Sequence, residues 1–189
     1  MIRAQRLEDL ARAVELARLG ARPPVIRDLC RSVPSTESIR IYTEVVGTKP
    51  PQGQLPSRHE SLMETQKLRW QGSVIAVAYS GVKDTLERYQ DAYVSAYRYY
   101  REILSGEDLL YSFDRAWMLL RQLSIRNISV VTCSRCDAQY IHNNQDIINH
   151  DRNCPVCVAV RRNGQLCQIE TVRQCANGER KRIRLPAAA

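Results

Sequence analysis

The chain has 189 residues, 44% of them hydrophobic, and a formal net charge of +8 at pH 7. This length and composition predict a globular protein that holds one ordinary domain and a small second one. No apolar run approaches the roughly eighteen residues of a membrane-spanning helix, and the charged N-terminus does not resemble a signal peptide. We therefore expect a cytoplasmic protein with no membrane partner. Seven cysteines, an odd number, argue against a disulfide framework and favour reduced thiols that bind metal.

The first part of the chain predicts two helices. Apolar residues recur every three or four positions from Leu7 to Ala21, which indicates an amphipathic helix that Gly20 ends. Pro23 and Pro24 then suit the first turn of a second, shorter helix. The two helices are therefore expected to be joined by a tight turn.

A third helix is expected after Pro34, with Ser35 or Thr36 as its cap. Its buried side is expected to comprise Ile39, Ile41, Tyr42, Val45 and Val46. Helix, short turn and helix over about residues 23–46 have the outline of a helix-turn-helix unit that contacts DNA, although helical hairpins without this function are commoner. The candidate DNA-binding residues in and after this unit are Arg27, Arg31, Arg40 and Lys49.

The middle of the chain predicts a linker and three more helices. The prolines and glycine of residues 48–56 exclude helix and strand, so this segment is expected to be a linker or an extended arm. The helices are expected at about residues 61–79, 82–103 and 109–123. Residues 74–79 form an apolar run that can be buried on all sides. The next helix has a tyrosine-rich seam that is expected to fill the core or an interface rather than to stack on bases: Val82, Leu86, Tyr89, Tyr93, Ala96, Tyr100 and Ile103. Arg115 and Arg121 are expected to point outward.

Two Cys-x-x-Cys pairs, separated by seventeen residues, dominate the C-terminal part of the chain. This spacing lets four thiolates converge tetrahedrally on one Zn²⁺, because each pair forms a tight turn and the intervening loop returns. The predicted ligands are Cys133, Cys136, Cys154 and Cys157. Four thiolates leave no open coordination position, so one structural zinc ion per chain is expected and no catalytic one. Two alternatives stay open, namely four unrelated cysteines or a site in which His142 or His150 replaces a cysteine.

Strands are expected on both sides of the first cysteine pair. The β-branched residues of 128–131 precede Cys133, and residues 139–141 follow Cys136, as in a zinc-ribbon hairpin with the cysteine turn at its tip. Residues 168–172 suit one further strand. The chain is thus predicted to be mainly α. A multi-helix N-terminal body is expected over residues 1–126, and a small C-terminal zinc-ribbon-like module with four cysteine ligands and a basic tail over residues 127–189.

The end of the chain is basic. From residue 158 onward, seven basic residues stand against two acidic ones, a surplus of five positive charges. A metal module followed by a basic segment is typical of proteins that contact phosphates, and a solvated tail that only aids solubility is the alternative. The candidate phosphate contacts are Arg161, Arg162, Arg180, Lys181, Arg182 and Arg184.

Five motifs in a fixed order give the chain a resemblance to a known family. They are Leu19-Gly20-Ala21-Arg22, the arm Gly47-x-Lys49-Pro50-Pro51-x-Gly53-x-Leu55-Pro56, Ala96-Tyr97-Arg98-x-Tyr100, Arg115-Ala116-Trp117-x-Leu119-x-Arg121 and the cysteine quartet. With these motifs the chain resembles the FlhC family of flagellar transcriptional activators, from about the first helix through the second cysteine pair. Cys167 and Cys175, in the basic tail, lie outside the family's pattern.

The resemblance implies a non-enzymatic subunit that acts with a partner, FlhD, in a hetero-hexamer of four FlhD and two FlhC chains. It implies that this complex binds promoter double-stranded DNA of flagellar operons and recruits RNA polymerase to switch on flagellum biosynthesis. It also implies that the four cysteines hold a structural zinc ion, and no small-molecule substrate is expected.

Two other hypotheses stay open beside DNA binding. One is a zinc-stabilised assembly subunit of a regulatory complex in which the partner makes the DNA contacts. The surplus positive charge of the tail argues against it, because interface cores are depleted of charge. The other is a redox switch at Cys167 or Cys175, which requires a lowered thiol pKa.

Overall fold

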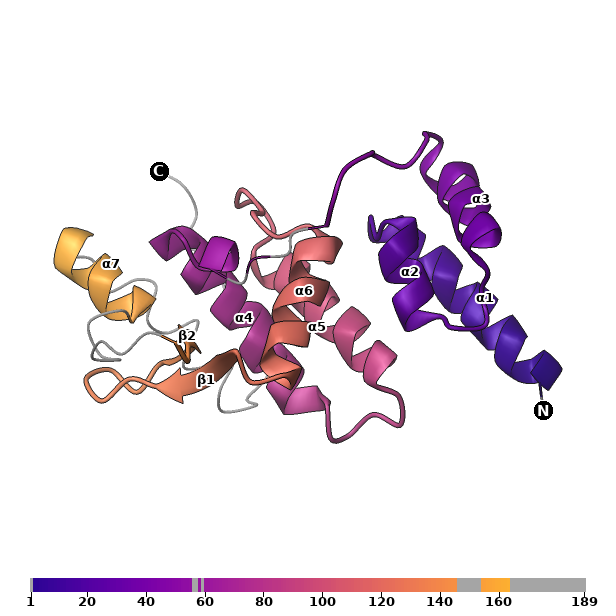
Figure 1. The fold of residues 1–189 in the computed structure, drawn as a ribbon. Coiled ribbons are helices and arrows are strands. Elements are labelled where there is room, and N and C mark those ends of the chain that lie inside the picture. Colours follow the sequence, from indigo (N-terminus) through magenta and orange to yellow (C-terminus); the bar gives the residue numbers. More distant parts are fainter. Residues whose placement is uncertain (1, 56–57, 59, 146–153, 164–189) are drawn as a thin grey trace.

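The computed structural model describes residues 2–55, 58, 60–145 and 154–163, which form a mainly helical body with a two-stranded sheet (Figure 1). Its elements are α1 (Ile2–Arg18), α2 (Pro23–Leu29), α3 (Ser35–Val46), the 3-10 turn η1 (Glu60–Leu62), α4 (Gln66–Val82), α5 (Tyr89–Ile103), α6 (Phe113–Ser124), β1 (Ile128–Thr132), β2 (Gln139–Asn143) and α7 (Pro155–Asn163). The predicted mainly α fold with a small four-cysteine region is confirmed. The strand expected at residues 168–172 lies outside the described residues.

The N-terminal helices α1, α2 and α3 pack on one another (Figure 1). The predicted end of α1 before Gly20, start of α2 at Pro23 and end of α3 before Gly47 are confirmed. Gly20 and Gly47 follow the last turns of α1 and α3 with φ of +86° and +79°. This left-handed backbone suits glycine, because a Cβ atom would be strained there. Pro23 is the first residue of α2, as its fixed φ favours.

Two details of α3 were predicted wrongly. Pro34 occupies the N-cap position in place of Ser35 or Thr36, and no side chain caps the helix. Ile39 and Val46 are 47% and 40% exposed, whereas Ile41 is buried. Since α3 packs with α1 and α2 on one side, a narrow apolar stripe is enough to fill the contact.

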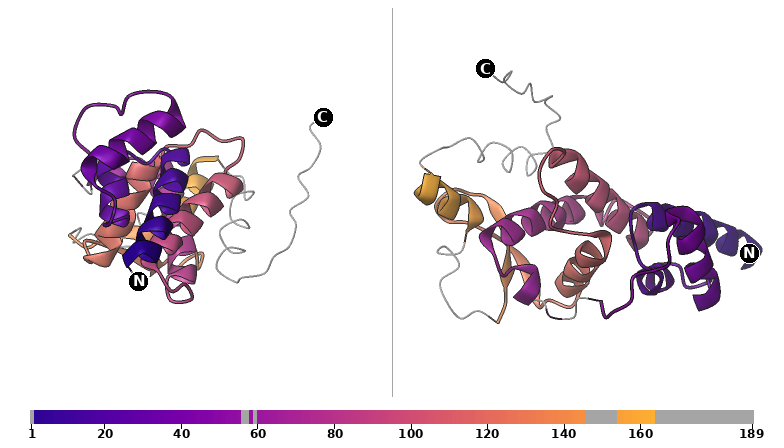
Figure 2. Two further views of the ribbon diagram at one scale, coloured as in Figure 1. Left: turned by 90° about the vertical axis from the view of Figure 1, so that its right-hand side faces the viewer. Right: turned by 90° about the horizontal axis from the view of Figure 1, so that it is seen from above.

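Helix α4 lies at the centre of the fold. Residues 71–77 are buried without a break, and only Ala78 and Tyr79 of the predicted apolar run are partly exposed. Helices α5, α6 and α7 and strand β2 pack against α4. Figures 1 and 2 show the two-stranded sheet and α7 at the opposite end of the molecule from α1, α2 and α3. Among the described helices, none combines the length and apolar character that a membrane-spanning segment needs.

The next three helices begin later than predicted. Helix α4 begins at residue 66 rather than 61, α5 at residue 89 rather than 82, and α6 at residue 113 rather than 109. Side-chain caps explain two of these starts, since Thr65 Oγ1 accepts a hydrogen bond from the Leu68 N–H (3.1 Å) and Ser112 caps α6 in the same way. Leu86 and Leu109, which were expected on buried faces, therefore lie in exposed connections.

Three of the five tyrosines of α5, Tyr93, Tyr97 and Tyr100, lie in the core, in line with the predicted core-filling role of this helix. Of the predicted seam, the buried members are Tyr93, Ala96 and Tyr100, whereas Tyr89 is exposed. The Tyr100 hydroxyl donates a hydrogen bond to Gln71 Oε1 (2.6 Å) and accepts one from the Tyr111 N–H (3.2 Å). The Tyr111 hydroxyl donates to the carbonyl of Leu62. This network joins α4, α5 and the segment before α6 through satisfied buried polar groups.

The two arginines of α6 differ in their surroundings. Arg121 is exposed, as predicted, and its guanidinium lies 5.3 Å from the centre of the Trp117 ring, a cation–π contact. Arg115 was expected to point outward, but it is only partly exposed and donates hydrogen bonds to the carbonyls of Leu110 (3.2 Å) and Ser61 (3.4 Å). Arg115 therefore ties η1 to the start of α6.

Replacing Gly72 by Ala is expected to destabilise the protein. The added Cβ would lie 2.5 Å from the Tyr111 hydroxyl and 2.7 Å from Ile141 Cδ1, and overpacking of this kind costs about 1–3 kcal/mol. Gly81→Ala in the same helix is the matched control, because its Cβ would meet open space. That change should stabilise by about 0.5–1 kcal/mol or be neutral. Urea unfolding of both variants measures the difference, and equal stabilities would contradict the close packing at Gly72.

Candidate metal centre

The first cysteine pair lies in the turn between β1 and β2. The strands are antiparallel, with Ile128 opposite Asn143 and Thr132 opposite Gln139, so the turn between them carries Cys133 and Cys136 at its tip. This confirms the predicted hairpin. The Cys133 N–H donates to the carbonyl of Ala138, and the Asp137 N–H donates to the carbonyl of Cys133, both at 3.0 Å. Asp137 has a φ of +57°, a left-handed conformation that closes the turn.

The second cysteine pair belongs to α7, a helix that the sequence analysis did not predict. Cys154 immediately precedes the helix and Cys157 lies in its first turn. The Val158 N–H donates to the carbonyl of Cys154 at 3.1 Å, so the first helical hydrogen bond holds the pair together. Pro155 is the signal that could have revealed this helix, since proline favours the first helical position.

The four cysteines come together in space. Their Sγ atoms all lie within 4.8 Å of one another. The Sγ atoms of Cys133 and Cys157 are 3.7 Å apart, as are those of Cys136 and Cys154. A disulfide would need about 2.0 Å, whereas four sulfurs around a tetrahedral zinc ion with bonds of about 2.3 Å lie about 3.8 Å apart. The geometry therefore fits a metal ion, and the cluster could hold one.

Among the described residues this cluster consists of cysteines alone. His142 is buried in β2 and is not one of its members, so the alternative that it replaces a cysteine is not supported. His150 lies outside the described residues. Cys30 is buried in the core formed by the helices, where desolvation, and next the charge of Asp9, raise the pKa of its thiol to about 12.

The thiols of the cluster differ in their electrostatic surroundings. Burial raises the pKa of Cys154 and, together with hydrogen bonds to Cys136 and Cys133, raises that of Cys157 to about 11. Burial also opposes ionisation of Cys133, but hydrogen bonds to its sulfur from the backbone of Arg135 and Cys136 lower its pKa overall. Without metal, at least two of the four thiols thus resist ionisation at neutral pH. A bound cation is what would compensate for the charge of gathered thiolates.

Apolar contacts anchor the cluster to the helical body. Trp70 of α4 packs both against the main core and against the small core around Cys133, Tyr140 and Val156. Three residues further along α4, the Ser73 hydroxyl accepts a hydrogen bond from the Ile141 N–H of β2 at 3.0 Å. The role of Trp70 is not predictable from the sequence, because its contacts are distant in the chain and leave no periodic pattern.

The sequence of the chain is similar to those of known proteins. The chain matches the family described as flagellar transcriptional activator (FlhC) over residues 3–169, a span that includes all four cysteines. The chain belongs to the FlhC family. It is therefore a flagellar transcriptional activator that regulates flagellar genes, and it is not an enzyme.

Similar relatives include three proteins described as flagellar transcriptional regulator FlhC. The relative from Cupriavidus metallidurans is 34% identical over 148 residues, which cover 75% of this chain and 67% of the relative. That from Thauera aminoaromatica is 31% identical over 179 residues, or 88% and 86% of the two chains. That from Cupriavidus necator is 31% identical over 165 residues, or 85% and 79%.

Four candidate DNA-binding residues of this FlhC-family chain have side chains that the structure describes, and none of the four belongs to the cysteine cluster. Arg27, Arg31, Arg40 and Lys49 are exposed in α2, α3 and the segments that follow them. The backbone of Arg161 and Arg162 lies in α7, close in sequence to Cys157. Outside the described residues lie Arg180, Lys181, Arg182 and Arg184, as do Cys167 and Cys175.

Metal content gives a direct test of the cluster. Protein purified without chelator is expected to hold about one equivalent of tetrahedral metal ion, and Cys154→Ala should lose it. Cys30→Ala is the matched control, since it removes a buried thiol outside the cluster. Inductively coupled plasma mass spectrometry measures the content, and replacement by Co²⁺ should give thiolate charge-transfer absorption. Metal-free wild-type protein, or a Cys154→Ala variant that keeps its metal, would contradict the site.

Proposed function

We propose that this chain is a DNA-binding subunit that acts in the cytoplasm with FlhD, binds promoters of flagellar operons and recruits RNA polymerase. Membership of the FlhC family, over a match that spans residues 3–169, supports this proposal more than any other observation. We further propose an assembly of four FlhD and two FlhC chains. In it, the helices of residues 1–126 dock the partner, and residues 127–189 form the zinc module with its basic tail.

The metal in this proposal is one structural zinc ion per chain, held by Cys133, Cys136, Cys154 and Cys157. The thiolate donor set and the sulfur separations near 3.7 Å support zinc, for which four thiolates form a closed site. When bound, the ion would supply a rigid tetrahedral cross-link and no reactive position. The protein's own contribution is to present the first pair on a hairpin and the second on a helix end.

The DNA contacts in this proposal come from two groups of basic residues. Arg27, Arg31, Arg40 and Lys49 would act from the helix-turn-helix-like unit of residues 23–46 and the arm behind it. Arg161, Arg162, Arg180, Lys181, Arg182 and Arg184 would contact phosphates from the region after the cysteines. Exposure of the first group supports it, because a phosphate contact needs a side chain that solvent can reach.

One observation favours the alternative, an assembly subunit whose partner makes the DNA contacts. Arg40, in the middle of α3, lies 3.7 Å from both Glu37 and Glu44. The two acids offset its charge and would repel phosphates from this part of the helix. In addition, Arg27 donates a hydrogen bond to the Ser35 hydroxyl at 3.2 Å. If α3 does not face DNA, the phosphate contacts must come from the basic tail or from FlhD.

Assembly with FlhD is the first test of the proposed function. Co-expressed with FlhD, the chain should purify as one complex whose mass in native mass spectrometry corresponds to four FlhD and two FlhC-family chains. The complex should bind fragments of flagellar promoters and protect a defined segment from nuclease. A chain that remains free of FlhD after co-expression would contradict the proposed partner.

Salt dependence then separates DNA binding from pure assembly. Each neutralised phosphate contact adds about 0.9 to the slope of log affinity against log salt concentration. In the complex with FlhD, the double substitution Lys181→Ala and Arg182→Ala should therefore flatten the slope by about 2, with little change in sequence preference. The matched control is Lys83→Ala with Arg101→Ala, which removes the same charge from exposed positions elsewhere. Equal slopes for the two double variants would favour the assembly subunit.

A further inference from the structure

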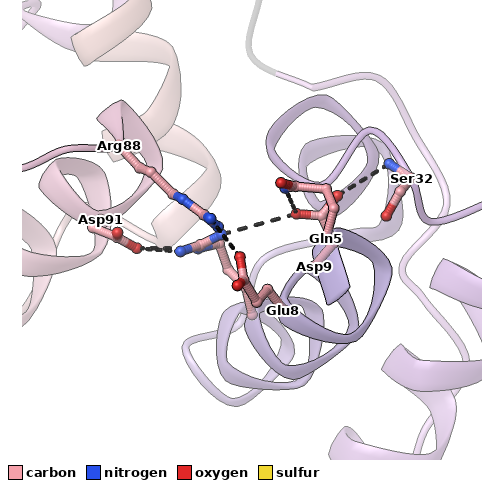
Figure 3. A network of polar contacts seen from close by, with 7 residues as sticks. Gln5, Glu8, Asp9, Ser32, Arg88 and Asp91 are labelled. Atoms are coloured by element: carbon pink, nitrogen blue, oxygen red, sulfur yellow. Dashed lines mark hydrogen bonds and ion pairs between the residues drawn. The ribbon is translucent and has the colours of Figure 1, made fainter. Parts of the chain in front are cut away.

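The N-terminal unit, defined here as α1, α2 and α3, meets α5 and α6 through polar contacts at three places. The first is a row of ion pairs that α1 makes with Arg88, just before α5, and with residues of α5, and Figure 3 draws the pairs of Arg88 and Asp91. The pairs are Glu8–Arg88, Arg12–Asp91 at 2.6 Å and Glu15–Arg98 at 2.6 Å. The charges alternate in sign along both partners, so a displacement of α1 along α5 would bring like charges together.

The same row reaches the turn between α2 and α3. Asp9, which lies 3.9 Å from Arg12, accepts a hydrogen bond from the backbone N–H of Ser32 at 3.2 Å (Figure 3). The second place of contact lies nearby on α2, where Asp28 accepts a hydrogen bond from Trp117 Nε1 of α6 at 3.0 Å. Helix α2 is thus hydrogen-bonded to α6, and the turn after it to α1.

The third place of contact is Arg22, where one side chain joins three segments. The Arg22 N–H and Nε both donate to the carboxylate of Asp114 in the first turn of α6, at 2.9 and 2.6 Å. Its Nη1 and Nη2 donate to the carbonyls of Gly53 and Gln54 in the arm, at 3.3 and 3.4 Å. The Arg22 carbonyl accepts the first hydrogen bond of α2, from Val25. The segment before α2, the arm after α3 and the start of α6 therefore meet at one guanidinium.

We propose that Arg22 and Asp114 are positioning residues, which set the orientation of the N-terminal unit, with its helix-turn-helix-like residues 23–46, relative to the body formed by α4, α5 and α6. They would thereby fix the spacing of DNA half-sites that the complex accepts. This inference rests on the proposed function. In a complex with two copies of this chain, the separation of the two units depends on the joint between unit and body. A rigid joint accepts one spacing, whereas a loose joint accepts several.

The geometry favours Arg22 over the ion pairs of α1 for this role. The Arg22 and Asp114 side chains are 15% and 7% exposed, whereas in each α1–α5 pair at least one partner is more than a third exposed. Screening by salt is weak for a buried pair and strong for exposed ones. The planar fork of the guanidinium also fixes direction, because its donors reach a carboxylate and two carbonyls at once. Lysine carries the same charge but cannot make these contacts together.

The test uses the complete complex with FlhD and a promoter fragment that the wild-type complex protects. A second fragment carries an insertion of about five base pairs between the half-sites, which rotates them by about half a helical turn. The wild-type complex should lose affinity for it on the order of tenfold or more. Complexes with Arg22→Lys or Asp114→Asn should bind the parent fragment more weakly than the wild-type complex does. The insertion should reduce their affinity by a clearly smaller factor than it reduces that of the wild-type complex. Arg18→Lys, an exposed arginine at the end of α1, is the matched control and should keep the wild-type profile.

The outcomes separate this inference from the proposed function. If the wild-type complex binds neither fragment, the proposed function fails. If it discriminates between them and both variants discriminate equally well, Arg22 and Asp114 do not set the spacing. If neither variant assembles with FlhD, the pair serves the fold of the body and the inference is also overturned. Assembled variants with wild-type metal content, weaker binding and relaxed spacing are the supporting result.

Discussion

The arrangement of the fold depends on the burial of α4. Residues 71–77 have no exposed face, so other elements must cover the helix on every side. Two of these residues, Gln71 and Ser73, are polar, and burying them is unfavourable unless partners satisfy them. Gln71 accepts hydrogen bonds from the Tyr100 hydroxyl and the Leu110 N–H, and the Ser73 hydroxyl accepts one from the Ile141 N–H of β2. The apolar residues of α4 thus require neighbours, and its polar residues decide which neighbour lies where.

The packing around α4 also determines where the cysteine cluster lies. Ser73 fixes β2 on α4, Trp70 packs against the small core that contains Cys133 and Cys154, and the hairpin then places Cys133 and Cys136. Bringing Cys154 back to the first pair closes a loop of seventeen residues, which costs on the order of 2–3 kcal/mol in chain entropy. Structural zinc in small domains binds with on the order of 10–16 kcal/mol, well above that cost. The helical core therefore sets where the site lies, and a bound ion would determine whether it closes.

Local signals made much of this fold predictable from the sequence. Gly20 and Gly47 end helices, and Pro23 begins one. The residues on both sides of the first cysteine pair predicted the hairpin, and the cysteine spacing predicted the cluster. Helix α7 was missed because Val156, Val158 and Val160 are β-branched and favour strands, while Pro155 gave only a single opposing signal. The contacts of Trp70 and Arg22 were not predictable. Arg22 and Asp114 are 92 positions apart, and nothing in the chain's periodicity reports which carboxylate lies opposite which arginine.

At the joint between the N-terminal unit and the body, exposed and buried ion pairs have different effects. Exposed ion pairs such as Glu15–Arg98 contribute about 0–1 kcal/mol and weaken with salt. They therefore attract α1 to α5 but do not determine its orientation. A buried pair such as Arg22–Asp114 adds little net stability, because desolvation offsets the attraction, yet losing one partner leaves a buried charge unpaired. The penalty for any other orientation is therefore larger than the gain from the observed one. Such a joint restricts the orientation of the N-terminal unit more than it adds to the free energy of unfolding. This suits a subunit that must hold one unit at a set angle to another.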